Sequence, residues 1–284
     1  MKTYSKRLFD KQAFSVYFLI FISVILFPNR LFSGNYPPDI ERIINRGKLI
    51  VAMHSEDAPP FFMNDEKGRL YGFDVKLAKD IGRRLGVEVV FKRETDTYDG
   101  VIHMIARREA DIAISYLSKT LKRSMRVRFT EPYITMNLAL LVNRLMAAQK
   151  KKGQSMSEIL KNMDEKIGVL AASSHIGYVK ELFPKAVMTT YKAFDPYIVD
   201  AVIKGDVFAG FFDEVEIKRV IRKHPELSLK LKMVILKDIQ DPISIAVPWD
   251  SMHLLSWLNF YLSSTKLDVT ADSVLDQYPE AISK

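Results

Sequence analysis

The segment GFDVKLAKDIGRRLG (72–86) carries the clearest helical signal of the chain. Every fourth residue is apolar, which places these side chains on one face of a helix. An acidic residue near the predicted start suits the positive end of the helix dipole, and a glycine at the predicted end supplies a left-handed cap. The apolar residues are Phe73, Leu77, Ile81 and Leu85, the acidic residue is Asp74, and the glycine is Gly86.

Short β-branched runs flank this helix. KLIVAM (48–53) and VEVVFK (87–92) have the composition of strands. A second helical segment, YDGVIHMIARREA (98–110), is followed by a third apolar run, DIAIS (111–115). Strands that alternate with helices are joined by right-handed crossovers and lie parallel. The first half of the chain therefore predicts an α/β lobe.

A polar segment, SYLSKTLKR (115–123), follows the third predicted strand directly. Ligands of parallel sheets bind beyond the carboxyl ends of the strands, which is where this segment falls. On these nine residues alone, a polar turn is the better explanation of the composition. The residues of interest are Ser115, Tyr116, Ser118, Thr120 and Arg123.

A second series of strands and helices fills the rest of the chain, without internal repeats or low-complexity tracts. It predicts a second α/β unit, entered through an extended connection. The connection is LALLV (138–142), and the later segments are KIGVLAASSHIGYVKELF (166–183), YIVDAVIKG (197–205), VFAGFFDEVEIKRVI (207–221), the strand PISIAV (242–247) and the helix MHLLSWLNFYLSS (252–264).

Composition and charge indicate a globular protein without a nucleic-acid partner. The 284 residues are 48% hydrophobic and 27% charged, with a formal net charge of +8. Half of that charge, +4, lies in residues 1–33, and the remaining +4 is too weak for a nucleic-acid-binding surface. The length suits two modest lobes, each with its own core.

The amino terminus, residues 1–33, has the layout of a secretory signal peptide. Basic residues precede AFSVYFLIFISVILF (13–27), and Ser33 suits the position before a cleavage point. The uncharged run is shorter than the about 18 to 20 residues of a membrane-spanning helix, and an uncleaved signal-anchor is the alternative. Both interpretations place residues 34–284 outside the cytoplasm. The chain has no cysteine, which excludes disulfides and a thiol nucleophile.

Taken together, these segments resemble the extracellular solute-binding proteins of the polar amino-acid type, the capture components of ABC importers. The resemblance runs from about residue 40 to the carboxyl end. It rests most on YGFDVKLAKDIGRRLG (71–86) and on the serine- and threonine-rich segment that leads through Arg123 to RFTEPY (128–133). The order and spacing of these segments together carry the resemblance.

The resemblance implies a two-lobe type II periplasmic-binding-protein fold. In it, two α/β lobes, each a mostly parallel sheet flanked by helices, are joined by two extended crossings near 133–140 and 236–244. We therefore expect a first lobe from residues 36–134 and 243–284 and a second lobe from residues 135–242. We also expect a monomer that closes on a small ligand, delivers it to a membrane permease, and needs neither cofactor nor metal.

In the first lobe the resemblance assigns four residues to the ligand. Arg123 matches the arginine that grips the carboxylate of an amino acid, since its planar fork suits two parallel hydrogen bonds. Ser118 matches a nearby hydroxyl, and Ser115 matches a polar contact to the ammonium. Tyr98 matches an aromatic that packs on the aliphatic part of the ligand. A surface arginine, turn serines and a loop aromatic are the structural alternatives.

In the second lobe the resemblance assigns three residues. Ser173 and Ser174 lie at the amino terminus of a predicted helix, where free N–H groups favour an anion. Asp213 matches the acid that accepts the ammonium, because a dry cleft must pair both charges of an amino acid. Turn serines and a helix N-cap aspartate are the structural alternatives.

One departure from the family pattern concerns the pocket for the ligand side chain. Members with a full aromatic sandwich carry a large ring two residues before the proline–phenylalanine pair of the first loop, where this chain has Ala58. Tyr116 stands at a position that is usually small. We expect its ring to fill the gap, which leaves open a ligand other than a standard amino acid.

Enzymatic and sensory functions are the alternatives. The five histidines, His54, His103, His175, His224 and His253, have no metal-ligand spacing, and no nucleophile elbow, phosphate loop or dinucleotide fingerprint is present. Periplasmic cyclohexadienyl dehydratases resemble these binding proteins and would need a carboxylic acid in the cleft, such as Glu214 or Glu216. A membrane-anchored ligand-sensing module is favoured if the signal is not cleaved.

Overall fold

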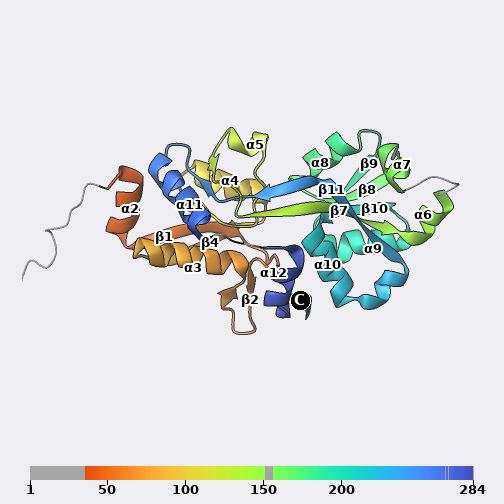
Figure 1. The fold of residues 1–284 in the computed structure, drawn as a ribbon, viewed down its shortest axis with the longest axis horizontal. Coiled ribbons are helices and arrows are strands. Elements are labelled where there is room, and N and C mark those ends of the chain that lie inside the picture. The colour runs from red at the N-terminus through yellow and green to blue at the C-terminus, as the bar shows by residue number, and fades with distance from the viewer. Residues whose placement is uncertain (1–35, 151–155, 266, 268, 284) are drawn as a thin grey trace, which may run out of the picture.

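The structure is a computed structural model that describes residues 36–150, 156–265, 267 and 269–283. The signal-peptide prediction for residues 1–33 lies outside these residues. Two five-stranded sheets, each with helices packed on it, form two lobes side by side along the longest axis of the molecule (Figure 1). The predicted two-lobe α/β architecture is confirmed.

The first lobe is built on a sheet in the order β4-β1-β5-β12-β6. The pairs β1–β4 and β1–β5 are parallel, as the strand–helix alternation predicts, whereas β12 pairs antiparallel with β5 and β6. The strands are β1 (Lys48–His54), β4 (Glu88–Thr95), β5 (Ile112–Ala113), β6 (Arg128–Phe129) and β12 (Ala246–Val247), with a hairpin of β2 (Met63–Asn64) and β3 (Leu70–Tyr71). The helices are α2 (Pro38–Arg46), α3 (Phe73–Leu85), α4 (Tyr98–Ala106), α5 (Leu121–Ser124) and α11 (Met252–Thr265).

The second lobe is built on a sheet in the order β11-β7-β10-β8-β9. Parallel pairs join β10 to β8 and β8 to β9, and antiparallel pairs join β7 to β10 and β11. The strands are β7 (Ile134–Asn143), β8 (Lys166–Leu170), β9 (Val187–Tyr191), β10 (Ala209–Asp213) and β11 (Leu231–Ile243). The helices are α6 (Arg144–Lys150), α7 (Met156–Lys161), α8 (His175–Leu182), α9 (Val199–Lys204) and α10 (Glu214–Lys223), with the short turns η1 (Phe194–Ile198) and η2 (Pro225–Leu229).

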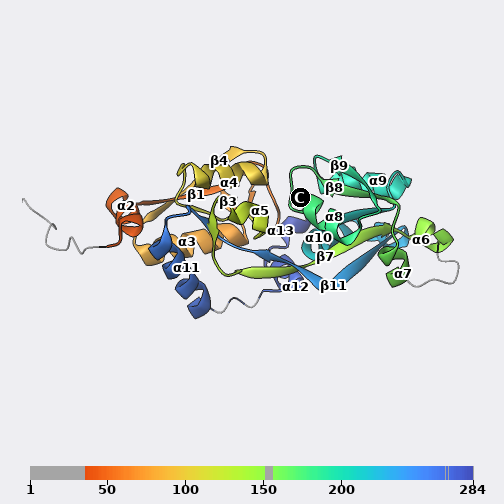
Figure 2. The same ribbon diagram turned by 90° about the horizontal axis from the view of Figure 1, so that it is seen from above.

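The two lobes are joined by β7 and β11, which run side by side between them (Figures 1 and 2). Ile134 pairs with Ile243 where both strands leave the first lobe, and Met136 pairs with Asp241 farther along. The segment 138–142, expected to be only a connection, is thus also the central part of a sheet strand. Residues 134–243 form one continuous insertion between β6 and β12 of the first lobe.

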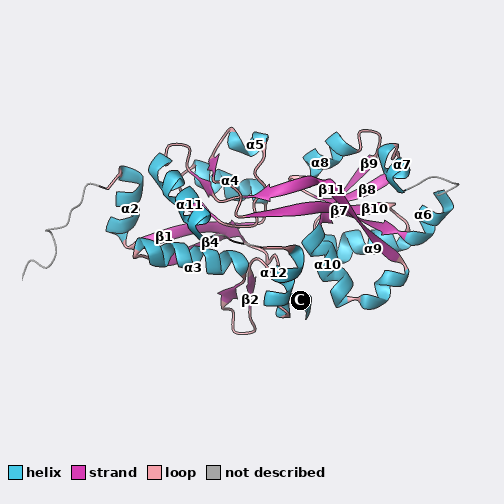
Figure 3. Cartoon of the chain, viewed as in Figure 1, coloured by secondary structure: helices cyan, strands magenta, loops and turns pink. Residues whose placement is uncertain are grey.

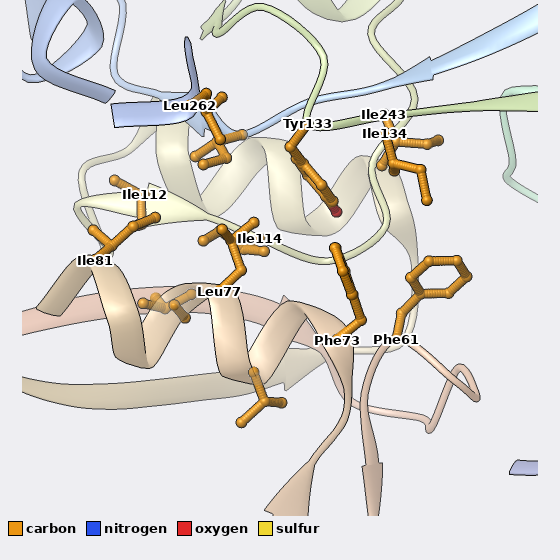
Figure 4. Close-up of a cluster of buried hydrophobic side chains, with 14 of the residues drawn as sticks. Phe61, Phe73, Leu77, Ile81, Ile112, Ile114, Tyr133, Ile134, Ile243 and Leu262 are labelled. Carbon is orange, nitrogen blue, oxygen red and sulfur yellow. The ribbon is translucent and has the colours of Figure 1, made fainter. Parts of the chain in front are cut away.

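The core of the first lobe lies between α3 and the sheet. The side chains of Leu77 and Ile81 from α3 face Ile112 and Ile114 near β5 (Figure 4). Each is buried, and burial of an aliphatic side chain contributes about 1.5–3 kcal/mol. Phe73 at the start of α3 faces Tyr133, close to the point where the chain enters β7 (Figure 4). The core therefore reaches the base of the hinge.

The last segment of the chain contacts both lobes. Helices α12 (Ala271–Gln277) and α13 (Glu280–Ser283) pack against α10 of the second lobe. Ion pairs join α12 to α10, from Asp272 to Lys218 and Arg222. Val274 and Leu275 nevertheless belong to the core cluster of the first lobe. The segment 243–284, expected to return to the first lobe, thus ends as a bridge to the second (Figure 3).

Candidate functional site

Two of the cavities between the lobes adjoin each other and are lined by residues of the predicted site. One, called here the main cavity, has a volume of about 190 Å³, and the other, called the inner cavity, has a volume of about 20 Å³. Both are lined by residues of the two lobes. They share four lining residues, which are Tyr98, Tyr116, Leu170 and Phe212. Any ligand held here contacts both lobes at once.

Arg123 lines the inner cavity and is 5% exposed. Its Nε donates to Asp99 at 3.1 Å, and its Nη1 donates to the carbonyl of Ser118 at 3.1 Å. Burial alone would raise the pKa of Asp99, but the charges and hydrogen bonds of Arg123 and Lys122 together outweigh burial and lower that pKa. The side chain of Arg123 is therefore held in place by protein groups, not by a ligand alone, and is not a surface arginine.

Three of the serines predicted to bind the ligand line the inner cavity, and two of them contact each other. The hydroxyls of Ser118, from the first lobe, and Ser174, from the second, lie 2.8 Å apart at the inner cavity. Ser173 lines the same cavity, but its hydroxyl donates to the carbonyl of Leu170 at 2.7 Å. Ser174 is the N-cap of α8 without a side-chain capping bond. The structure thus brings these three serines together with Arg123.

Asp213 lines the main cavity at the end of β10. One carboxylate oxygen accepts from the N–H of Glu216 at 2.9 Å, so Asp213 is the N-cap of α10, as one alternative proposed. The other oxygen, Oδ2, is buried without a hydrogen-bond partner of normal geometry. Burial raises the pKa of Asp213 to about 7, and the bond from Glu216 opposes that rise. The N-cap role thus leaves Oδ2 for a further donor.

Tyr116 lines both cavities, and its ring stacks on Phe61 with centroids 3.6 Å apart. Its φ of 48° is unusual for a bulky residue and costs conformational energy. The buried carboxylate of Asp74 accepts the N–H of Tyr116 at 2.6 Å and the hydroxyl of Tyr133 at 2.9 Å. These bonds hold the Tyr116 backbone in its left-handed conformation. Burial raises the pKa of Asp74 to about 7.

The hydroxyl of Tyr116 is close to Asp213 across the cleft. It is buried without a hydrogen bond of normal geometry. Burial raises the pKa of Tyr116 most, and the Asp213 carboxylate raises it further. The Tyr116 hydroxyl and the Asp213 carboxylate, from opposite lobes, thus face each other across the cleft.

The two remaining first-lobe residues of the prediction, Tyr98 and Ser115, differ in whether they line a cavity. Tyr98 lines both cavities, with its ring 4.8 Å from the ring of His54. Burial raises the pKa of Tyr98, so it stays neutral. Ser115 lines neither cavity, because it is fully buried and its hydroxyl accepts the N–H of His54 at 2.9 Å. In this structure Ser115 ties the end of β1 to the polar segment.

The candidate dehydratase acids are both in ion pairs. Glu216 lines the main cavity, but both its oxygens accept from Arg219 at 2.8 Å. Glu214 accepts from Asn137 at 2.7 Å and pairs with Lys218. Both glutamates are thus already engaged by cationic or amide partners within the second lobe or at its hinge strand.

Several residues of the site were not predicted from the sequence. They are Asp99, which pairs with Arg123; Phe61, Phe194 and Phe212, which line the main cavity; and His175 and Asp241, which line the inner cavity. Burial lowers the pKa of His175 to about 3, so it is neutral. Asp99 and Phe212 are sequence neighbours of the predicted Tyr98 and Asp213, which is the one local signal for them. Among the described residues, no group of three or more acids and histidines is placed to hold a metal ion.

Comparisons with known proteins indicate the family of the chain. The family model of the bacterial extracellular solute-binding proteins, family 3, matches residues 49–281. The ABC transporter arginine-binding protein 1 of Escherichia coli (strain K12) is 26% identical over 226 residues, which cover 78% of this chain and 86% of the relative.

Two solved structures have the same fold. One is an amino acid ABC transporter substrate-binding protein from Streptococcus pneumoniae bound to L-arginine, with a TM-score of 0.67, 26% identity, and coverage of 86% of this chain and 99% of the other. The second is an ancestral amino acid-binding protein described as a precursor of cyclohexadienyl dehydratase, with a TM-score of 0.65, 28% identity, and coverage of 84% and 98%. The predicted family and its two-lobe fold are confirmed: the chain belongs to the bacterial extracellular solute-binding proteins, family 3.

Proposed function

We propose that the protein captures a free cationic amino acid outside the cytoplasm, by closure of its two lobes, and delivers it to the permease of an ABC importer. The observation that carries the proposal is the placement of Arg123 and Asp213. These opposite charges come from different lobes and line adjoining cavities with shared walls. A free amino acid has one carboxylate and one ammonium, which such a pair neutralises when the cleft closes.

The carboxylate is assigned to Arg123. Two of its five N–H donors are bound to Asp99 and Ser118, through Nε and one hydrogen of Nη1. The second Nη1 hydrogen and the Nη2 group form the edge of the fork that suits two parallel bonds to a carboxylate. The ammonium is assigned to Asp213, whose Oδ2 faces the Tyr116 hydroxyl, a second oxygen that the ammonium can contact.

The charge of the main cavity favours a cationic ligand side chain. Six of its lining residues are acidic and two are basic, with the acids Glu56, Asp57, Asp96, Asp195, Asp213 and Glu216 and the bases Lys192 and Arg219. Some of these acids are already paired, Asp57 with Arg93 and Glu216 with Arg219. Glu56 and Asp96 are exposed at the cavity, where a second ligand cation would meet them.

The aromatic lining favours the same class. Phe61, Tyr98, Tyr116, Phe194 and Phe212 all line the main cavity. Aromatic faces attract cations, and a planar guanidinium stacks on them. The relative from Escherichia coli is named for arginine binding, and the structure from Streptococcus pneumoniae is bound to L-arginine.

We infer a binding protein that acts as a monomer and not an enzyme. The ion pairs of Glu214 and Glu216 argue against the dehydratase alternative, although the similarity to an ancestral precursor of cyclohexadienyl dehydratase makes a direct assay worthwhile. Incubation with prephenate or arogenate should yield no aromatic product. No helix among the described residues is long and apolar enough to cross a membrane, and amino-terminal sequencing of the exported protein tests whether residues 1–33 are removed.

The main test is a thermal-shift screen with arginine, lysine, histidine, glutamine and leucine, followed by calorimetry. Arginine or lysine should stabilise the protein by about 2.7 kcal/mol at a hundred times its dissociation constant. Small-angle scattering with saturating ligand should show compaction of a monomer. Preference for leucine, or no shift with any amino acid, would contradict the proposal.

A further inference from the structure

Asp241 is a buried acid at the hinge for which the ligand assignments leave no role. It lies in β11 opposite Met136 of β7, in the stretch of paired strand that joins the lobes, and is 2% exposed. Burial raises its pKa to about 6, while hydrogen bonds from two hydroxyls and the charge of Arg123 oppose that rise. A buried carboxylate without partners is costly, so the partners of Asp241 show what it does.

Those partners come from opposite lobes. The hydroxyl of Ser118, in the first lobe, donates to Oδ2 of Asp241 at 2.6 Å. The hydroxyl of Tyr178, in α8 of the second lobe, donates to Oδ1 at 3.1 Å. Each oxygen of the Asp241 carboxylate thus accepts a hydrogen bond from a different lobe. Both bonds can form together only when the lobes are close.

The same carboxylate sets the direction of the bond between the lobes. Ser118 has a single hydroxyl proton, and Asp241 accepts it. The contact of 2.8 Å between the Ser118 and Ser174 hydroxyls therefore has Ser174 as its donor. Ser174 and Tyr178 are one turn apart on α8, and both reach Asp241, one directly and one through Ser118.

Asp241 also connects with Arg123. The carbonyl of Ser118 accepts the Nη1 of Arg123, and the next residue, Lys119, donates its N–H to the carbonyl of Pro242 beside Asp241. The segment of Ser118 and Lys119, which positions the guanidinium, therefore packs against the end of β11. A shift of Ser118 away from Asp241 would move an acceptor of Arg123.

We propose that Asp241 is a positioning residue that latches the lobes closed, by accepting one hydroxyl from each lobe and fixing Ser118 beneath Arg123. Only the predicted effect of the latch on ligand release depends on the proposed function. Its effect on the distance between the lobes needs no ligand.

The test uses the full chain, whose lack of cysteine allows site-specific labelling. Met125→Cys in the first lobe and Lys180→Cys in the second place nitroxide labels at exposed positions, just after α5 and within α8. Pulsed electron resonance then gives the distance between the lobes without ligand. In this background Asp241→Asn weakens both bonds, and Tyr178→Phe removes only the bond from the second lobe. The matched control is Asp238→Asn, at an exposed position of the same strand.

The latch predicts longer distances in Asp241→Asn and Tyr178→Phe than in the parent, with Asp238→Asn unchanged. With arginine as the probe, Asp241→Asn should release ligand roughly tenfold faster, at an association rate within about twofold of the parent, since losing hydrogen bonds to a charged group costs at least a factor of ten.

Folded Asp241→Asn and Tyr178→Phe proteins with the parent's distances would overturn the latch, as would the same shift in Asp238→Asn. If the parent binds no amino acid, the proposed function fails, and the distances still decide the latch. Thermal unfolding of each variant separates loss of the latch from loss of the fold, and Tyr178→Phe serves if Asp241→Asn does not fold.

Discussion

The ring of Tyr116 stacks on the ring of Phe61, with planes at 18° and centroids 3.6 Å apart. Phe61 belongs to the loop in which Ala58 replaces the large ring expected of a full aromatic sandwich. The ring of Tyr116 thus lies beside this loop and lines both cavities. This placement supports the hypothesis that Tyr116 supplies the missing wall.

Replacement of Tyr116 tests this wall. Tyr116→Phe keeps the ring and should bind the identified ligand within about threefold of the parent, because the hydroxyl is one acceptor among others. Tyr116→Ser removes the ring and should weaken binding about tenfold or more, since loss of an aromatic contact costs about 1.5–3 kcal/mol. Calorimetry on both variants is the measurement, and a Tyr116→Ser protein that binds like the parent would remove Tyr116 from the site.

Replacement of Arg123 tests the carboxylate assignment. Arg123→Ala leaves the ligand carboxylate unpaired in a closed cleft, and the loss of one partner of a buried pair costs about 3–5 kcal/mol. Affinity should fall at least about a hundredfold. Arg123→Lys should recover only part of it, because an ammonium lacks the two-pronged geometry. Lys122→Ala is the matched control, since that side chain is 85% exposed and shares the partner Asp99. Unchanged affinity in a folded Arg123→Ala protein would refute the assignment.

The affinity should depend on pH through Asp213. Burial raises the pKa of this carboxyl from 3.8 to about 7, so below pH 7 the protein without ligand holds a proton there. An ammonium binds the ionised form, and binding must then release that proton. Affinity should therefore rise with pH up to about 7 and be about tenfold weaker at pH 6 than on the plateau.

Calorimetry between pH 5.5 and 8.0 measures this dependence, because the ammonium and carboxylate of free arginine or lysine stay almost fully charged over that range. Asp213→Asn is the control: it should bind more weakly and lose most of the pH slope. A parent affinity that does not change between pH 5.5 and 8.0 would show that Asp213 does not hold the ammonium.

Substitution of Gly72 by alanine should destabilise the fold. Its φ is +127°, and a Cβ there would lie 2.4 Å from the carbonyl oxygen of Phe61. That carbonyl accepts the N–H of Asp74 at the start of α3, so Gly72→Ala disturbs the loop beneath Tyr116. We expect a loss of several kcal/mol in the free energy of unfolding.

Gly177→Ala is the matched control for Gly72→Ala. It lies within α8 with open space around the added methyl, and should be neutral or more stable by up to about 1 kcal/mol. Urea denaturation compares the two variants. Equal stability of both would mean that the loop tolerates a side chain at Gly72.

The sequence predicted helices and strands well where the signals for the start and end of an element lie within the element itself. The helix predicted over 72–86 is α3, Phe73–Leu85, because its apolar period and the left-handed Gly86, with φ of 71°, are both encoded within the segment. The expected parallel pairs β1–β4 and β1–β5 follow from the same alternation. The antiparallel strands at the hinge have no such signal, because their partners lie more than a hundred residues away.

The candidate site rests on the family resemblance and only in part on signals in the residues themselves. Arg123 and Asp213 both follow strands, and that position indicates a cleft. Nothing near Arg123 indicates Asp99 as its partner, and nothing near Asp241 indicates burial, because both depend on how distant segments pack. The burial of Ser115 behind the site has the same origin: alternation along a strand shows two faces, but not which face the ligand meets.

The pairing of Ile134 with Ile243 has a consequence for how such a protein can be recombined. Because the inserted residues begin and end side by side, an exchange of 134–243 with a homologous protein needs only two junctions, at neighbouring positions of one ladder. Such a chimera would carry Asp213 and the α8 serines from one parent and Arg123 and Tyr116 from the other. Its α10 would also have to suit the foreign α12, whose acidic residues pair with Lys218 and Arg222. On the proposed assignment of Arg123 and Asp213, recognition of the ligand's two ends is thus divided between separately exchangeable pieces of the gene.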